Sequence, residues 1–115
     1  MAVTTHRELD VGIVKTFLRS LREGRIYIAR AVRSGRNGRY TYLLLPAELL
    51  NVLNLGSESR FRVSIGRDYV DYIIDERGDY KLTIHRGAQI RFPVDVPKGY
   101  VLIEPRPRGF RVYFA

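Results

Sequence analysis

The chain has 115 residues, of which 45% are hydrophobic and 28% charged, a composition typical of one globular domain with a single core. Its longest apolar run, Tyr40 to Pro46, is too short to span a bilayer, so we expect no membrane segment. The absence of cysteine and of a secretory signal pattern favours a cytoplasmic protein without disulfides or a cysteine metal site.

Charge is the most informative bulk property. The formal net charge is +8, and 17 of the 20 basic residues are arginine, which favours an anionic partner. Arginine suits phosphates and base edges, but genome composition or adaptation to high temperature produces the same bias, so both explanations stay open. Residues 1–39 carry a net charge of +6 and the other 76 residues only +2. The N-terminal third is therefore where we expect a binding surface.

Taken in chain order, the elements begin with a predicted amphipathic helix, Arg7 to Arg22, where apolar residues recur at helical spacing. From Arg25 the pattern changes to alternation, which predicts short strands. One short helix interrupts them, with Pro46 at its first position and Gly56 as its stop. The predicted strands are Arg25 to Arg33, Arg39 to Leu45, Arg60 to Ile65, Tyr69 to Ile74, Tyr80 to His85, Gln89 to Phe92, Tyr100 to Ile103 and Gly109 to Phe114.

These elements predict a single α+β domain over residues 1–115 that is mainly β, an antiparallel sheet or a partly closed small barrel. Residues 1–24 form its N-terminal helix, residues 25–66 a basic hairpin with a strand-Pro-helix-strand unit, and residues 67–115 further antiparallel strands. In the strand Arg60 to Ile65 we expect Phe61, Val63 and Ile65 to face the core.

The hairpin near residues 25–45 is the main candidate for a binding surface. A two-residue turn at Asn37-Gly38 would place Arg36 opposite Arg39, an unfavourable pairing of like charges. A phosphate would relieve it, and so would water at an exposed tip, so both interpretations stay open. In this register Ile26, Ile28, Val32, Leu43 and Leu45 form the core face, and Arg25, Tyr27, Ala29, Ala31, Arg33, Tyr40, Tyr42 and Leu44 form the other.

A second turn with arginines, Arg106 and Arg108, precedes the last strand. Tyr40 and Tyr42 have an alternative explanation, which is packing against another strand or the helix. The candidate nucleic-acid-binding residues are Arg25, Tyr27, Arg33, Arg36, Arg39, Tyr40, Tyr42, Arg106 and Arg108.

Catalytic patterns are weak in this chain. His6 and His85 form no metal pair, and no phosphate-binding glycine loop occurs. A nuclease centre built from the acidic stretch Asp68 to Asp79 with Lys81 is disfavoured, because its carboxylates belong to a turn or to opposite strand faces. We therefore expect no enzymatic activity, no cofactor, no metal and no small-molecule substrate.

The run Gly38 to Ile65 contains, in this order, a Gly-Arg pair, a strand ending in Leu45-Pro46, a short helix and a second strand. This order resembles the swapped-hairpin AbrB-like (AbrB/SpoVT-type) family. A fainter second copy over residues 86–114 repeats the order without the helix, with Gly87, Pro93 and Gly99 in place. The resemblance implies a homodimeric, DNA-binding transcription regulator with arginines of its hairpin on the DNA. Two copies in one chain would close a small barrel without a second subunit.

The sequence thus predicts a non-enzymatic nucleic-acid-binding protein, with DNA favoured over RNA as its partner. One alternative is a binder of single-stranded DNA or RNA, with bases stacked on Tyr27, Tyr40 and Tyr42. The other is a protein-protein interaction or assembly module, cellular or viral, whose basic hairpin and exposed strands meet an acidic partner.

Overall fold

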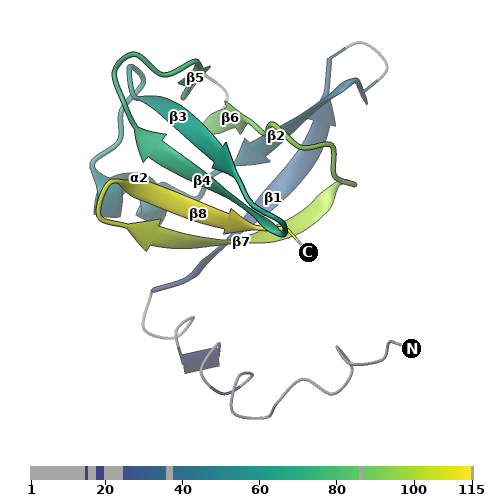
Figure 1. The fold of residues 1–115 in the computed structure, drawn as a ribbon, viewed down its shortest axis with the longest axis horizontal. Coiled ribbons are helices and arrows are strands. Elements are labelled where there is room, and N and C mark those ends of the chain that lie inside the picture. The colour runs from purple at the N-terminus through teal and green to yellow at the C-terminus, as the bar shows by residue number, and fades with distance from the viewer. Residues whose placement is uncertain (1–14, 16–17, 20–24, 36–37, 86, 115) are drawn as a thin grey trace.

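The computed structural model of the chain describes residues 15, 18–19, 25–35, 38–85 and 87–114. In this part, eight strands form one antiparallel sheet in the order β5-β3-β4-β8-β7-β1-β2-β6 (Figure 1). The elements are β1 (Tyr27–Ser34), β2 (Tyr40–Leu44), α2 (Ala47–Leu53), β3 (Arg60–Ile65), β4 (Tyr69–Ile74), β5 (Tyr80–Lys81), β6 (Gln89–Arg91), β7 (Gly99–Arg106) and β8 (Gly109–Tyr113).

The two ends of the sheet meet. Thr83, just after β5, and Gln89 of β6 exchange two backbone hydrogen bonds of 2.9 and 2.8 Å. The sheet is therefore nearly closed into a barrel, and the predicted mainly β architecture is confirmed. No helix in the described ranges is long and apolar enough to cross a membrane.

The barrel interior is an aromatic and aliphatic core. Tyr72 lies at its centre, with its ring stacked on Phe110 at a centroid distance of 4.8 Å. The Tyr72 hydroxyl donates a 2.7 Å hydrogen bond to the Arg91 carbonyl, so this buried polar group is satisfied. Burial raises the pKa of the Tyr72 hydroxyl well above its ordinary value. The other fully buried side chains are Phe61, Leu43, Leu49, Leu82, Ile90, Ile103, Val70 and Val112.

The predicted register of the first hairpin is wrong by one residue. The structure pairs Val32 with Tyr42 and ends the ladder at Ser34 with Tyr40, so a five-residue connection, 35–39, replaces the two-residue turn. A shift by one residue exchanges the faces of β1. The buried residues of β1 are consequently Ala29 and Ala31, whereas Ile28 is exposed and Val32 half-buried on the outer face.

Small inward side chains on β1 have a physical reason. The interior of a narrow barrel is filled by combining small with large residues. Ala31 pairs with the buried Leu43 of β2, and Ala29 pairs with the buried Val101 of β7. On β2 the prediction holds, because Leu43 and Leu45 are buried. In β3, Phe61 is buried and Val63 half-buried as expected, but Ile65, the last residue of the strand, is 58% exposed.

Helix positions differ from the prediction in detail. Pro46 is the N-cap of α2 rather than its first residue, and Asn54 ends the helix in the left-handed conformation before Gly56 is reached. The predicted helix Arg7 to Arg22 lies outside the described residues except at positions 15 and 18–19, which are helical. The predicted strand Tyr80 to His85 is a two-residue strand followed by isolated bridges.

The strand order has a two-fold pseudo-symmetry. Exchanging β1, β2, β3 and β4 with β5, β6, β7 and β8 reproduces the same order around the nearly closed barrel. The registers correspond as well, and only α2 has no helical counterpart, since residues 92–98 between β6 and β7 contain no helix. Equivalent opposed pairs are Val63–Tyr72 with Ile103–Val112, and Phe61–Tyr80 with Val101–Ala29.

Candidate functional site

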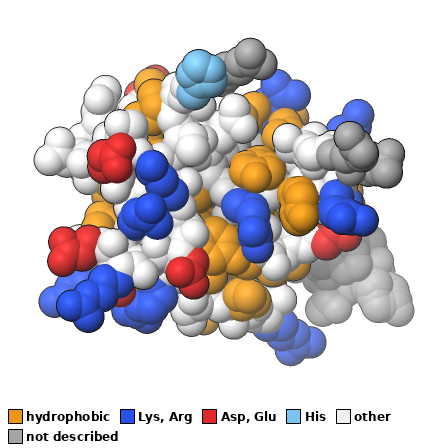
Figure 2. All heavy atoms as spheres, turned by 90° about the horizontal axis from the view of Figure 1, so that it is seen from above, with side chains coloured by type: hydrophobic (Ala, Val, Ile, Leu, Met, Phe, Trp, Pro, Cys, Tyr) orange, Lys and Arg blue, Asp and Glu red, His pale blue; other side chains and the backbone are white. Residues whose placement is uncertain are grey.

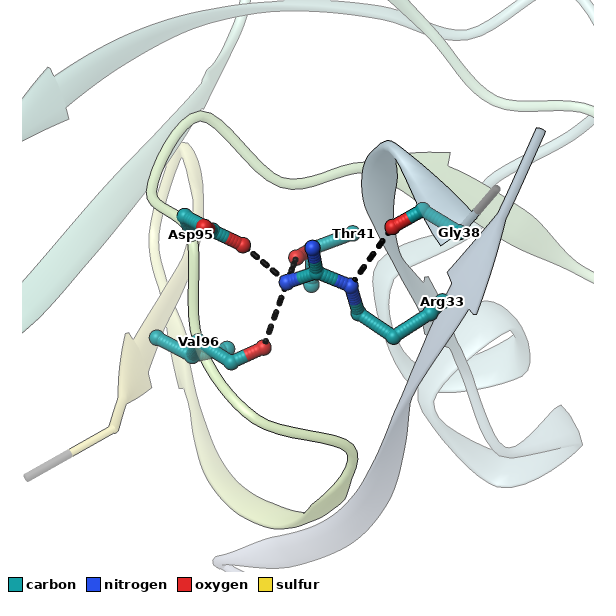
Figure 3. Close-up of polar contacts among 5 residues, drawn as sticks. All are labelled: Arg33, Gly38, Thr41, Asp95 and Val96. Carbon is teal, nitrogen blue, oxygen red and sulfur yellow. Dashed lines mark hydrogen bonds and ion pairs between the residues drawn. The ribbon is translucent and has the colours of Figure 1, made fainter. Parts of the chain in front are cut away.

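Arg33, a predicted contact residue, forms contacts with other residues of the same chain (Figure 3). Its guanidinium forms an ion pair with Asp95 and donates hydrogen bonds to the Gly38 carbonyl at 2.9 Å, the Val96 carbonyl at 3.3 Å and the Thr41 hydroxyl at 3.4 Å. These partners belong to the β1–β2 connection, to β2 and to the segment between β6 and β7. Arg33 therefore braces the end of the barrel, and its placement with Tyr40 and Tyr42 on one outer face is wrong.

Two further predicted residues lie near the start of β1. Tyr27 points inward, is half-buried and packs against the core, so it does not share the outer face of Tyr40 and Tyr42. Its inward direction follows from the corrected register, in which it alternates with the exposed Ile28. Arg25 precedes the strand and is exposed.

Arg106 and Arg108 lie at the other end of the barrel from the β1–β2 connection. Because Ala31 pairs with Gly99 and Tyr27 with Ile103, the end of β7 lies beyond the first residues of β1. Arg106 forms a 2.9 Å ion pair with Glu104, while Arg108 is exposed in the β7–β8 turn. The structure therefore does not bring these arginines together with the basic hairpin.

The remaining predicted residues lie around the outer face of β2. Tyr40 is 45% exposed, Tyr42 is half-buried, and Arg39 directly precedes the strand and is exposed. Arg36, predicted to face Arg39, lies outside the described residues. On the neighbouring strand β6, Arg91 pairs with Tyr42, and its guanidinium carbon lies 5.8 Å from the centroid of the Tyr40 ring. Arg39, Tyr40 and Arg91 also line one shallow hollow.

Sequence reasoning missed a second group on the same outer face. Arg30 of β1 is exposed and pairs with Tyr100 of β7, whose side chain is 76% exposed. Lys98, two residues before Tyr100, joins them in lining a hollow of about 280 Å³. In the predicted register, Arg30 falls on the same face as the expected core residues Ile28 and Val32, and no local signal links it to Tyr100, 70 residues away.

These side chains form one continuous surface on β6, β2, β1 and β7. Arg30 and Tyr42 are diagonal neighbours, since Arg30 pairs with Leu44 and Val32 with Tyr42. Figure 2 looks onto the end with the β1–β2 connection, where basic side chains lie beside hydrophobic ones and acidic ones gather mostly in the left half. We call this surface the arginine-tyrosine face; it comprises Arg30, Arg39, Tyr40, Tyr42, Arg91, Lys98 and Tyr100.

Three cations on this face differ from Arg62 of β3 and Arg111 of β8. Within the described ranges, Arg30, Arg39 and Lys98 have no acidic partner. By contrast, Arg111 of β8 forms a bidentate pair with Asp71 of β4, at 2.7 and 2.9 Å, which raises the pKa of Arg111. Arg62 of β3 bonds to Asp75 at 3.3 Å. Arg30, Arg39 and Lys98 therefore lack the carboxylate partners that Arg62 and Arg111 have.

Two aspartates of the acidic stretch Asp68 to Asp79 have structural roles. Asp75 begins the β4–β5 turn, where it accepts hydrogen bonds from the Arg77 backbone and the Arg62 side chain, which lower its pKa. Asp71 is paired with Arg111, as described above. Among the described residues, no three His, Asp or Glu side chains come together as metal ligands.

Comparison of the chain with protein-family models, with curated proteins and with solved structures finds no match in any of the three.

Proposed function

We propose that this protein is a non-enzymatic nucleic-acid-binding protein and that the arginine-tyrosine face is its contact surface. The observation that supports this most strongly is the juxtaposition of exposed cations, unpaired within the described residues, with the exposed tyrosine rings Tyr40 and Tyr100. Guanidinium and ammonium groups neutralise phosphates, and aromatic rings contact bases. The net charge of +8 adds a long-range attraction for a polyanion.

DNA is the polymer proposed first. The AbrB-like resemblance implies a DNA-binding regulator that uses its basic hairpin, and Arg39 and Tyr40 of that hairpin belong to the proposed surface. The role of Arg33 differs from the one the resemblance implies, because its guanidinium is held by Asp95 and three other groups.

The alternative of an assembly module has less support. Pairing with a partner strand requires a free sheet edge. In the described part of the chain, the edge strands β5 and β6 lie next to each other and are linked through Thr83 and Gln89. The sheet therefore offers little free edge for a partner.

The proposal is tested by fluorescence anisotropy with labelled, mixed-sequence DNA over a series of salt concentrations starting near 50 mM. We expect binding that weakens as salt rises, and a shallower salt dependence for Arg30→Ala/Lys98→Ala. The matched control is Arg67→Ala/Arg77→Ala, which removes the same charge from exposed side chains on the β3–β4 and β4–β5 turns. Absence of binding, or equal effects of the two double variants, contradicts the proposal.

A further inference from the structure

The two-fold pseudo-symmetry supplies an internal comparison for the arginine-tyrosine face. The pair Arg30–Tyr100, between β1 and β7, is equivalent to the pair Lys81–Arg60, between β5 and β3. Lys98 lies two residues before Tyr100, at the position that Glu58 holds two residues before Arg60. One barrel position therefore occurs twice in the same chain with different side chains.

In the second occurrence, each of the two cations lies beside an acceptor. Lys81 lies 3.9 Å from the Glu58 carboxylate, and Arg60 donates a 3.2 Å hydrogen bond to the Gly78 carbonyl. The barrel thus accommodates this position with each cation beside its own acceptor.

In the first occurrence, these pairings are absent. Lys98 replaces the acidic residue, so that Arg30 and Lys98 line the same hollow without a carboxylate among its lining residues. Tyr100 replaces the arginine and leaves 76% of its surface exposed. The exposed ring leaves apolar surface in water, and the two cations that line the same hollow repel each other. A ligand with negative charge and a flat apolar surface would offset both costs.

We infer that this ligand is a single-stranded nucleic acid, with a base stacked on Tyr100 and backbone phosphates held by Arg30 and Lys98. The inference rests on the proposed function and specifies its substrate class. In a duplex the base faces are stacked on each other and cannot cover a tyrosine, whereas unpaired bases can. The outer face of the sheet lets successive nucleotides cross from β7 over β1 and β2 towards Tyr40 and Arg91.

The experiment compares binding of three labelled polymers of one mixed sequence, single-stranded DNA, single-stranded RNA and duplex DNA, each of about 16 nucleotides per strand. Tyr100→Ala is expected to weaken single-strand binding about tenfold or more, because one stacked base is lost. Tyr100→Phe, which keeps the ring, is expected to bind within about twofold of the wild type. The matched control Ile65→Ala removes another exposed apolar side chain, outside the face, and is expected to have no effect.

A second pair of variants compares cations at the two pseudo-symmetric positions. Arg30→Ala is expected to weaken binding and Lys81→Ala, its pseudo-symmetric counterpart, is not, because Lys81 already has Glu58 as a partner. Thermal unfolding of each variant verifies that the barrel is intact. The ratio of DNA to RNA affinity identifies which single strand is preferred.

The measured affinities either support or overturn the inference. Tighter binding of the single strands together with a loss in Tyr100→Ala but not in Tyr100→Phe supports the inference. Tighter binding of the duplex, or equal affinities of Tyr100→Ala and Ile65→Ala, overturns the inference and leaves the proposed function standing. Binding of none of the three polymers by the wild type overturns both.

Discussion

Arg33 on β1 forms an ion pair with Asp95 in the segment that connects β6 to β7, 62 residues further along the chain. Through the same guanidinium, Arg33 also holds the carbonyl groups of Gly38 and Val96. One side chain thus ties the β1–β2 connection to a long loop of the other half of the barrel.

Arg33→Ala is therefore expected to destabilise the protein rather than to weaken its ligand binding directly. Both partners of the ion pair are partly exposed, with side-chain exposures of 33% and 75%, so the pair alone contributes about 1 kcal/mol or less. With the lost hydrogen bonds, we expect the free energy of unfolding to fall by about 1–2 kcal/mol. Urea denaturation measures it, and a value unchanged within about 0.5 kcal/mol would contradict the bracing role.

The buried hydroxyl of Tyr72 makes stability depend on alkaline pH. The pKa of this hydroxyl is raised in the folded state, so the folded protein holds the proton more tightly than the unfolded chain does. The contribution to stability is complete below the unfolded pKa of about 10 and is lost as the pH rises towards the folded pKa. Denaturation series at increasing pH should show a steeper alkaline decline for the wild type than for Tyr72→Phe.

At neutral pH, Tyr72→Phe should itself cost about 1–2 kcal/mol, because the Arg91 carbonyl loses its 2.7 Å donor inside the barrel. Identical alkaline profiles of wild type and variant would mean that another group controls the high-pH transition.

Gly109 lies where β8 passes close to the backbone of its partner strand β4. A Cβ atom there would lie 1.8 Å from the Tyr72 carbonyl oxygen, and its φ of 152° is one that other residues rarely adopt. We expect Gly109→Ala to destabilise by about 3 kcal/mol or more. Gly56→Ala is the control, since no atom lies within 4 Å of the added methyl, and its effect should stay within about 0.5 kcal/mol. Thermal melts of both variants provide the comparison.

A single chain forms the whole pseudo-symmetric barrel, which removes one reason to expect a homodimer. Both halves of the nearly closed sheet come from one chain, with β4 paired to β8 and β2 to β6 across the pseudo-two-fold axis. A second subunit is therefore not needed to complete the barrel. We expect light scattering after size exclusion to give the monomer mass of 13.3 kDa, and a stable dimer would show that another surface associates.

The sequence predicts β3 and β4 correctly but not the first hairpin, and the contrast has a physical reason. The strands β3 and β4 begin and end at the predicted residues, because turn residues flank strongly alternating or apolar runs. The register of the first hairpin was predicted wrongly for two reasons. Asn37-Gly38 is a strong signal for a two-residue turn, and Ile28 and Val32 are more typical core residues than alanines are. The packing geometry of the barrel outweighed both signals, with Gly35 and Gly38 at positive φ in the longer connection.

The candidate site was predictable only in part, for the same reason. Arg39, Tyr40 and Tyr42 were identified because they are neighbours in sequence. Arg30 and Tyr100 come together only through the pairing of β1 with β7, which no local pattern specifies. Arg33 and Tyr27 were assigned to the wrong surface by the one-residue error, since each residue along a strand alternates between faces.

Contact between the arginine-tyrosine face and nucleic acid can be mapped by chemical-shift changes in ¹H–¹⁵N spectra as a mixed-sequence oligonucleotide is added. We expect shifts to concentrate on the outer-face residues Arg30, Val32, Tyr42, Arg91 and Tyr100, and to weaken as salt is raised. Shifts centred on Arg108 and the β7–β8 turn, or no shifts at low salt, would contradict it.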